Sequence, residues 1–326
     1  MEVFLAEPGS RVHVRRNSLY ITLRDGKRIP LTADVTQIII ASSRISISSK
    51  AVRIAAKMGI DIVFLDGKGD VVARLYPPVI NKTVSARVGQ YLAFNNQLAG
   101  IIASEIVYSK IYNQAQVIKY IGKSRRDERI VEAGREIEYI GTEVQLHSLE
   151  KFSVETLMNI EAKAAKRYWS IVAEILPSHL GFNGRNPDSL DPFNIALNYG
   201  YGILYAECDR ALVLAGLDPY LGLLHTLKSG KPSLTLDFME MFRSVVVDKG
   251  LIINASNLKV DIINGLLSYE SRKLIASIVL EALNRVVRSS KRSRSLKLRD
   301  HIRLEAYDLA DAFRSQTPYV GFRVRF

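Results

Sequence analysis

The chain has 326 residues, of which 48% are hydrophobic and 24% are charged. This balance excludes a disordered chain, and the length indicates about two domains. Forty-five Lys and Arg residues against 33 Asp and Glu give a net charge of +12. We therefore expect a polyanionic partner, and nucleic acid is the leading candidate.

Cys208 is the single cysteine, which excludes a disulfide framework and a cysteine zinc site. The apolar runs are too short to span a bilayer, and no basic segment followed by an apolar stretch opens the sequence. We therefore expect a cytoplasmic protein with no membrane span.

The segment from residue 2 to residue 76 has the pattern of β-strands. Asp25-Gly26 and Asp66-Gly67 lie between β-rich runs and predict hairpins. One helix, Ser49 to Met58, is expected to end before Gly59. The predicted strands are Val3–Ala6, Val12–Arg15, Leu19–Arg24, Val35–Ala41, Ile45–Ser48, Ile60–Leu65 and Val71–Leu75. Residues 1–76 are thus predicted to form a small β domain.

Helical periodicity replaces this pattern after a linker at residues 77–82, which contains Pro77-Pro78. Residues 83–326 are expected to form a larger all-α catalytic and DNA-binding domain, with helices continuing to about Ser315. The fold class is therefore α+β. Within this part we predict a helix that ends at Pro177, a loop at Asn183–Pro192, a helix at Phe193–Ala215, and a short helical piece from Asp218-Pro219 to His225.

Two basic clusters, Lys119 to Arg129 and Arg285 to Arg303, hold much of the positive excess. Such clusters either contact phosphates or form a solvated basic face. In the second cluster we take Arg292, Arg294 and Lys297 as candidate DNA contacts.

Glu161 lies on a helical stripe of apolar and small residues, with no basic residue three or four positions away. Because burying a carboxylate is costly, a cation must compensate it, either a metal or a distant basic side chain. His225 ends an apolar stretch, where a histidine is more often structural than a ligand.

Asp237 and Glu240 lie three residues apart near the start of a helix. Two neighbouring carboxylates favour a bound cation, although Arg243 can pair with Glu240 and Asp237 can cap the helix. Carboxylates with one imidazole suit Mg²⁺ or Mn²⁺, and the imidazole favours Mn²⁺. Such a metal can stabilise charge when an alcohol or water attacks phosphorus.

Four groups of residues follow one another in the second half of the chain. They are Glu161 with Ala165 and Tyr168, then Asp191–Tyr201, then Gly216–Pro219 leading to His225, and then Asp237–Arg243. In this order they resemble the family of CRISPR-associated protein one, the integrases of spacer acquisition. The resemblance extends to Ile29–Leu31, Ile45–Ser49 and Gly59–Asp66 in the β domain. Ala162 and Ser244 depart from the family pattern, and neither replaces a ligand.

The resemblance implies that Glu161, His225 and Glu240 are the catalytic metal ligands and that Asp237 supports them. We assign Tyr168 and Asn198 to support of the site, and Lys166, Arg167, Arg185 and Asn194 to DNA phosphates. The implied reaction is attack of a DNA 3′ hydroxyl on a phosphodiester, which inserts short foreign duplexes into a repeat array. The implied partners are double-stranded and branched DNA, a second copy of the chain bound through the β domain, and CRISPR-associated protein two.

Two other functions stay open. A transposon-encoded integrase resembles the same family, although it usually carries extra DNA-binding modules. A non-catalytic DNA-binding scaffold of the same fold is the other, although a scaffold does not need the complete ligand set.

Overall fold

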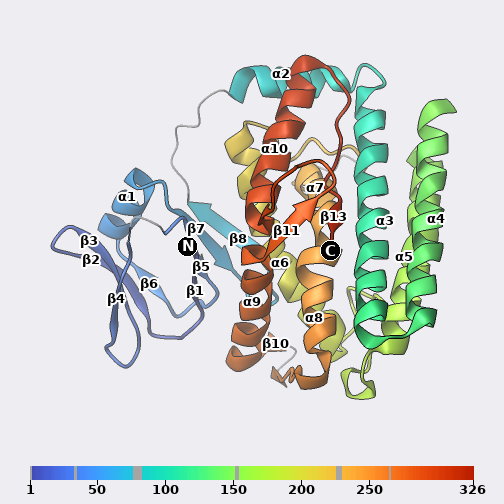
Figure 1. Cartoon of the computed structure of the whole chain (residues 1–326). Helices are drawn as coiled ribbons and strands as arrows, with labels where there is room; N and C mark the ends of the chain where they lie inside the picture. The colour runs from blue at the N-terminus through green and yellow to red at the C-terminus, as the bar shows by residue number, and fades with distance from the viewer. Residues whose placement is uncertain (1, 33–34, 76–82, 151–153, 225–229, 264–265) are drawn as a thin grey trace.

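The computed structural model describes residues 2–32, 35–75, 83–150, 154–224, 230–263 and 266–326 (Figure 1). Strands occupy the N-terminal part and long helices follow, so the predicted α+β class is confirmed. The predicted linker at residues 77–82 and His225 lie outside the described residues.

A four-stranded sheet joins the N-terminal part to the helices. Its strand order is β1-β5-β7-β8, with parallel pairs except for the antiparallel hairpin of β7 and β8. The strands are β1 (Glu2–Leu5), β5 (Gln37–Ile40), β7 (Asp61–Leu65) and β8 (Val71–Leu75). The hairpin predicted at Asp66-Gly67 is confirmed.

A second sheet, of order β4-β3-β2-β6, covers one face of the first together with helix α1 (Ser49–Lys57). Its strands are β2 (Arg11–Arg15), β3 (Ser18–Thr22), β4 (Arg28–Pro30) and β6 (Ser46–Ile47). The hairpin at Asp25-Gly26 is confirmed, and so is the end of α1 before Gly59, which has a φ of +70°.

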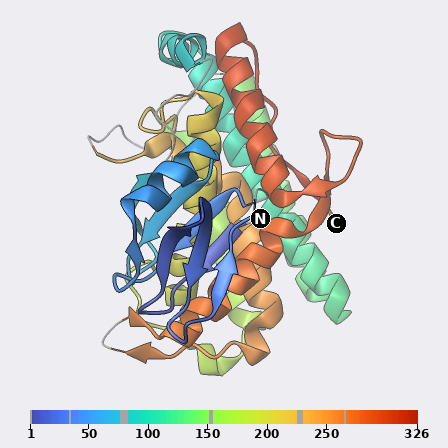
Figure 2. The same cartoon turned by 90° about the vertical axis from the view of Figure 1, so that its left-hand side faces the viewer.

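The first sheet contributes to two cores because its side chains alternate between its faces. Ile38 and Ile40 pack in the core of the N-terminal part, whereas Ile39 and Val63 pack in the core of the helices. Figure 2 shows the blue N-terminal strands lying directly against the helices. The β part is therefore fixed to the helical part by a shared hydrophobic core.

The helical part is built around long antiparallel helices, with α3 and α4 side by side in Figure 1. Its α-helices are α2 (Thr83–Ala93), α3 (Leu98–Arg125), α4 (Glu128–Glu150), α5 (Val154–Ile175), α6 (Pro192–Ala215), α7 (Ser233–Arg243), α8 (Lys249–Asn254), α9 (Tyr269–Asn284) and α10 (Leu298–Ser315). Short 3₁₀ turns lie at η1 (Ser178–Leu180) and η3 (Ala255–Asn257), and a π-helical turn, η2 (Ser244–Asp248), joins α7 to α8. Within the described ranges no helix is long and apolar enough to cross a membrane.

The prediction of an all-α second domain was incomplete. Short strands pair in this part as β9 (Ile262–Ile263) with β10 (Leu266–Leu267), and as β11 (Val286–Ser289) with β12 (Leu296–Lys297) and β13 (Val324–Arg325). These strands are too short to show a clear two-residue alternation in the sequence. Helix α6, by contrast, spans Pro192–Ala215 and ends at the left-handed Gly216, close to the predicted Phe193–Ala215, and Asp191 caps its start.

The prediction of a helical piece at Asp218 was wrong, because residues 217–224 form turns. Gln90 from α2 explains the difference. Its amide nitrogen donates to the carbonyl oxygens of Asp218 and Leu221, and its amide oxygen accepts from the N–H of Asp218. A side chain from another helix thus takes the backbone groups that a helix would pair internally.

The β7–β8 turn lies directly on helix α6. A Cβ atom on Gly202 of α6 would lie 1.7 Å from the carbonyl oxygen of Gly69, whose own φ is +96°. Beside this contact, Arg74 of β8 binds Asp61 and the carboxylate of Asp209 on α6. Only glycine at 202 allows this close approach of the two parts.

We expect Gly202→Ala to lower the free energy of unfolding by about 3 kcal/mol, because the added methyl group separates the turn from the helix. Gly141→Ala is the matched control: its Cβ would meet the side chain of Ile111 at 3.2 Å and that of Tyr108 at 3.7 Å, and no backbone atom. Its change should stay within about 1 kcal/mol. Urea denaturation of both variants tests this, and equal losses would contradict the close approach.

Candidate metal and DNA site

Two carboxylates predicted to act together meet at one ammonium group. Glu161 projects from α5 and Glu240 from α7, and Lys110 of α3 forms an ion pair with both. The distance from Lys110 Nζ to Glu240 Oε2 is 2.7 Å. The other oxygen of Glu240, Oε1, lies 2.6 Å from Arg243 Nη1. The ion pairs considered in the sequence analysis therefore exist, and they bring Glu161 and Glu240 to a common centre.

Lys110 and Glu240 meet in a poorly hydrated place. Lys110 has 14% of its side chain exposed, Glu240 6% and Glu161 23%. Burial lowers the pKa of Lys110, but the two nearby carboxylates outweigh this effect and raise it overall. The carboxylates likewise raise the pKa of Arg243 against the effect of burial. The centre thus holds two negative and two positive groups.

Asp237 does not cap α7, because that helix begins after Pro232 and Asp237 lies within its second turn. Its fully buried carboxylate oxygen Oδ2 accepts hydrogen bonds from the backbone N–H groups of Leu223, at 2.5 Å, and Leu224, at 3.0 Å. A Cβ atom on Gly222 would lie 2.9 Å from the same oxygen. Asp237 therefore fixes the backbone that leads into residue 225.

The residues present fit a divalent cation. Among the residues the structure describes, no group of three His, Cys, Asp or Glu side chains is placed to hold a metal. Glu161 and Glu240 nevertheless supply two carboxylates that already surround one cation. Oxygen ligands from carboxylates are those that Mg²⁺ and Mn²⁺ prefer.

Asp248 at the end of the π-helical turn links three elements. Its Oδ2 accepts from the hydroxyl of Tyr168 on α5 at 2.9 Å, and its Oδ1 accepts from the hydroxyl of Tyr201 on α6 at 2.6 Å. Tyr168 lies seven residues after Glu161 on the same helix. The bond therefore fastens α5 to the chain that follows α7, near the two carboxylates.

Arg185 and two asparagines close the loop before α6. Arg185 donates to the side-chain oxygens of Asn194, at 3.0 Å, and Asn198, at 2.7 Å. Asn194 is 1% exposed, and its amide nitrogen donates to Gly184 and Asp191. Both asparagines thus hold this loop in place through hydrogen bonds. The Arg185 guanidinium also lies 5.5 Å from the centre of the Tyr201 ring.

A cavity of about 220 Å³ opens beside the carboxylate pair. A larger hollow of about 770 Å³ shares Arg185, Tyr201 and Arg243 with it and reaches strand β8. The residues that line the smaller cavity include Lys110, Gln114, Trp169, Glu240, Arg243 and Asp248. The charged centre is therefore accessible from a recess and is not sealed in the core.

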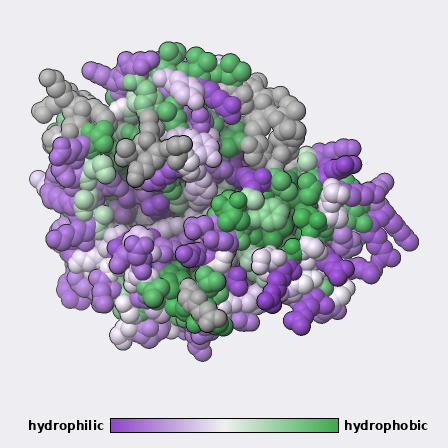
Figure 3. Space-filling model, turned by 180° about the vertical axis from the view of Figure 1, so that it is seen from behind, coloured by the Kyte–Doolittle hydropathy of each residue, from purple (hydrophilic) through white to green (hydrophobic). Residues whose placement is uncertain are grey.

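The candidate DNA contacts differ in their surroundings. Lys166, Arg294 and Lys297 are exposed, whereas Arg167 pairs with Glu136 at 2.5 Å. Arg292 is bound by Glu305 and Asp308, both on α10. Seen from behind, the surface is largely hydrophilic, with apolar residues gathered in separate patches (Figure 3). Exposed basic side chains are the ones available to phosphates.

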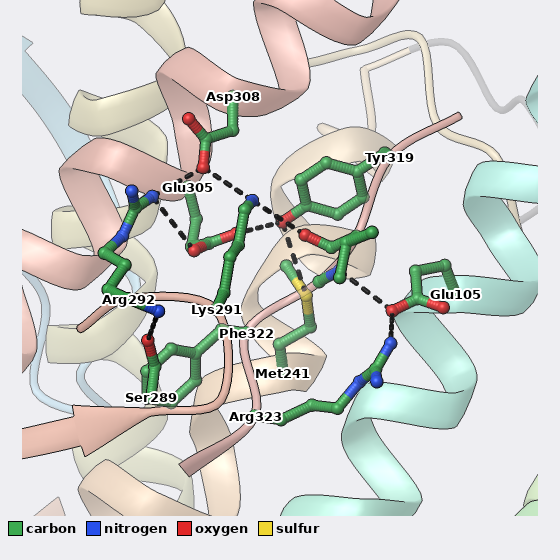
Figure 4. A network of polar contacts seen from close by, with 12 residues as sticks. Glu105, Met241, Ser289, Lys291, Arg292, Glu305, Asp308, Tyr319, Phe322 and Arg323 are labelled. Carbon is green, nitrogen blue, oxygen red and sulfur yellow. Dashed lines mark hydrogen bonds and ion pairs between the residues drawn. The ribbon is translucent and has the colours of Figure 1, made fainter. Parts of the chain in front are cut away.

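The segment after α10 fastens α3 to α7. Asn113, three residues after Lys110, donates to the carbonyl oxygens of Met241 and Phe322, at 2.7 and 2.9 Å. Figure 4 shows the surrounding network, in which Glu105 of α3 binds Arg323 and the backbone N–H of Gly321. In the same network Lys291 and Arg292 bind Glu305 and Asp308. Lys110 and Glu240 are thus presented by helices that cannot easily shift apart.

Sequence reasoning missed Lys110 and Asp248. Each is a charged residue within a run of otherwise buried residues, which is the signal that identified Glu161. The partners of Lys110 lie 51 and 130 residues away, and those of Asp248 lie 47 and 80 residues away, so spacing along one helix could not pair them.

Comparisons of the sequence identify one family, and two solved structures share its fold. The model of the family described as CRISPR associated protein Cas1 matches residues 3–275. The CRISPR-associated endonuclease Cas1 of Hyperthermus butylicus is 38% identical over 99% of this chain and 98% of its own length. A casposase bound to integration product has a TM-score of 0.81 at 22% identity, covering 98% of this chain and 92% of that one. A Cas6-RT-Cas1–Cas2 complex has a TM-score of 0.76 at 20% identity, covering all of this chain and 36% of that one.

The state of Asp248 gives a pH-dependent prediction. Burial raises the pKa of this carboxyl from 3.8 to about 6, although the Tyr201 and Tyr168 hydroxyls, Arg243 and Arg185 act in the opposite direction. The folded protein then holds the proton more tightly than the unfolded chain. The stability that Asp248 contributes is therefore fully present below pH 4 and falls by about 3 kcal/mol as the pH rises through 6.

Asp248→Asn removes this titration. Urea denaturation at pH values from 4 to 7 should show the stability of the wild type falling relative to the variant as the pH rises. A difference that is the same at every pH would contradict the raised pKa.

Proposed function

This chain belongs to the Cas1 family of CRISPR-associated proteins, and we propose that it is a metal-dependent DNA integrase and endonuclease that inserts short foreign duplexes into a repeat array. The curated relative that matches nearly its whole length is named an endonuclease. The observation that carries the proposal is the convergence of Glu161 and Glu240, from separate helices, on one charged centre.

Glu161, His225 and Glu240 would hold Mg²⁺ or Mn²⁺. When bound, the metal supplies positive charge that polarises a phosphoryl oxygen and stabilises the charge formed as an oxygen attacks phosphorus. The proposed set of two carboxylates and one imidazole leaves positions for water or substrate oxygens.

The other residues of the site hold these groups in place. Asp237 fixes the N–H groups of residues 223 and 224, and so orients the chain that enters residue 225. Arg243 binds Oε1 of Glu240, while Oε2 of the same carboxylate faces Lys110. Because these contacts are made within the protein, the carboxylates need little rearrangement when substrate enters.

The proposed joining reaction is a direct transesterification. The 3′ oxygen of one DNA end forms a bond to phosphorus and loses its proton, while the bond from that phosphorus to the target strand's 3′ oxygen breaks and that oxygen gains a proton. With water as the attacking group, the same site cleaves DNA.

For DNA binding we propose Lys166, Arg294 and Lys297 as phosphate contacts, because they are exposed. Arg167 and Arg185 become available where DNA phosphates replace their present partners. Arg185 lines both the small cavity and the larger hollow, so it lies on a path from the surface to the carboxylates.

We further propose a homodimer formed through residues 1–76, which acts with the small protein Cas2. Strand β4 and strand β8 are sheet edges with mostly exposed or half-exposed residues, and such edges need protection from unspecific pairing. A complex that contains Cas1 and Cas2 is among the proteins of the same fold. We propose that the reaction takes place in the cytoplasm.

A second candidate is an integrase of a transposon, which the likeness to a casposase supports at the level of the fold. The longer and closer match to a CRISPR-associated endonuclease favours the first function. The type of chemistry would be the same, because both begin from a DNA 3′ hydroxyl.

Removing either described carboxylate should abolish joining. We expect Glu161→Gln and Glu240→Gln to lower the rate of joining of a labelled 3′ end at least about 100-fold, because each change weakens metal binding without changing side-chain size. His225→Ala should have the same effect. Asp237→Asn keeps an acceptor oxygen and should lose roughly tenfold.

Glu138→Gln is the control, since this carboxylate pairs with Lys119 on α3 away from the site. Metal-free DNA binding should persist in all the variants, and excess chelator should stop joining by the wild type. Full activity of Glu161→Gln, or joining that survives chelation, would show the assignment to be wrong.

The basic segment before α10 gives a separate prediction. Replacing Arg294 and Lys297 by Gln should weaken binding of any duplex and lower the slope of log affinity against log salt by about 1.8, because each phosphate that is no longer neutralised accounts for roughly 0.9. Filter binding or fluorescence anisotropy over a range of salt concentrations measures both quantities.

Arg292→Gln distinguishes DNA binding from folding. It leaves the fully buried Glu305 with one cation fewer, so its main effect should be a lower melting temperature.

An unchanged salt slope in the Arg294 and Lys297 double variant would mean that this segment is a solvated surface.

A further inference from the structure

We propose that the ammonium group of Lys110 is a stand-in cation: it holds Glu161 and Glu240 together in the absence of metal and is displaced into the neighbouring cavity when the metal binds. The inference rests on the proposed metal site. It concerns the chain's own residues and what they do before the metal arrives.

The first support is the position of Lys110. Its Nζ contacts one oxygen of Glu161 and one oxygen of Glu240, and these carboxylates come from helices α5 and α7. An atom that bridges both carboxylates occupies the place where a shared divalent cation would bind. Without a cation there, two negative groups in a poorly hydrated site would repel each other.

The second support is the balance of charge. Glu161 and Glu240 carry two negative charges, and Lys110 and Arg243 carry two positive ones. A divalent cation added to this set would lie beside an ammonium group at contact distance and would be repelled by it. Arg243 binds Oε1 of Glu240, whereas Lys110 lies between Glu161 and Glu240, where the metal would bind. Lys110 is therefore the group that must leave.

The third support is the space next to Lys110. The cavity of about 220 Å³ is lined by Lys110 together with Gln114, Trp169 and Asp248, and also by Arg185 and Arg243, which already bind Asn198 and Glu240. A lysine side chain has a flexible four-carbon stem, so its nitrogen can move several ångströms while the backbone stays in place. The polar oxygens of Gln114 and Asp248 on the cavity wall can receive the displaced ammonium group.

The fourth support is the rigidity of helix α3. Asn113 binds Met241 and Phe322. Glu105 binds Arg323 and Gly321 (Figure 4), so both sides of Lys110 are tied to the segment after α10. The helix cannot readily withdraw to release the carboxylates. Displacement is therefore a rotation of the Lys110 side chain alone.

The alternative is a permanent structural ion pair, in which Lys110 stays between the carboxylates. The metal then binds elsewhere, or only to the carboxylate oxygens that Lys110 does not contact. The two cases differ in what happens when the positive charge is removed. A stand-in cation competes with the metal, whereas a permanent partner does not compete with it.

The test is Mn²⁺ affinity of the full-length protein, measured from the electron paramagnetic resonance signal of free Mn²⁺. Lys110→Met keeps the apolar stem and removes the charge, so it should bind Mn²⁺ roughly tenfold more tightly than the wild type. Lys110→Arg keeps the charge in a planar fork suited to two carboxylates and should bind Mn²⁺ about fivefold more weakly. Lys119→Met on the same helix is the control and should match the wild type.

Thermal melting gives a second readout. Metal-free Lys110→Met should melt below the wild type, because two carboxylates lose their shared cation, and saturating Mn²⁺ should raise its melting temperature more than that of the wild type. Should the Met variant not fold without metal, the weaker affinity of Lys110→Arg still tests the competition.

Equal or weaker Mn²⁺ binding by Lys110→Met, or unchanged binding by Lys110→Arg, would overturn the inference and leave the proposed function standing. The proposed metal site itself fails in a different way. In that case Glu161→Gln and Glu240→Gln would leave the Mn²⁺ affinity of the otherwise wild-type protein unchanged.

Discussion

The meeting of Glu161 and Glu240 at the ammonium group of Lys110 is the interaction on which the rest of the site depends. The three residues come from three different helices, so none of the helices alone defines the site. Like charges in a poorly hydrated place separate unless a cation lies between them. The arrangement therefore needs both a cation and a scaffold that holds α3, α5 and α7 at fixed distances.

That scaffold is polar as well as hydrophobic. Asn113 and the chain near Phe322 hold α3 against α7, and Asp248 holds α5 through the Tyr168 hydroxyl. Asp237 likewise holds the backbone before residue 225 by accepting hydrogen bonds from the N–H groups of Leu223 and Leu224. Buried polar groups whose partners are all supplied make an arrangement specific as well as stable, because a shifted helix would leave several of them unpaired. We therefore regard the hydrogen bonds as what sets the geometry of the carboxylates.

Much of this could be predicted from local patterns. Strand alternation, glycine turns and the helix stop at Gly216 indicated the order of the elements, and a carboxylate on an apolar stripe identified Glu161. Contacts between distant segments could not be predicted in this way. Lys110 finds its partners 51 and 130 residues away, and the turn at Asp218 is held by Gln90 against its own helical tendency. Local propensity is weak beside such tertiary contacts. Residue 225 lies outside the described ranges, so its role as a ligand stays a prediction.

The central claim is that one cation site lies between Glu161 and Glu240, and a crystal soaked with Mn²⁺ tests it most directly. Anomalous scattering should show manganese at roughly 2.2 Å from a carboxylate oxygen of each residue, with the Lys110 nitrogen moved into the adjoining cavity. Manganese bound elsewhere, with Lys110 still bridging the two carboxylates, would contradict the account.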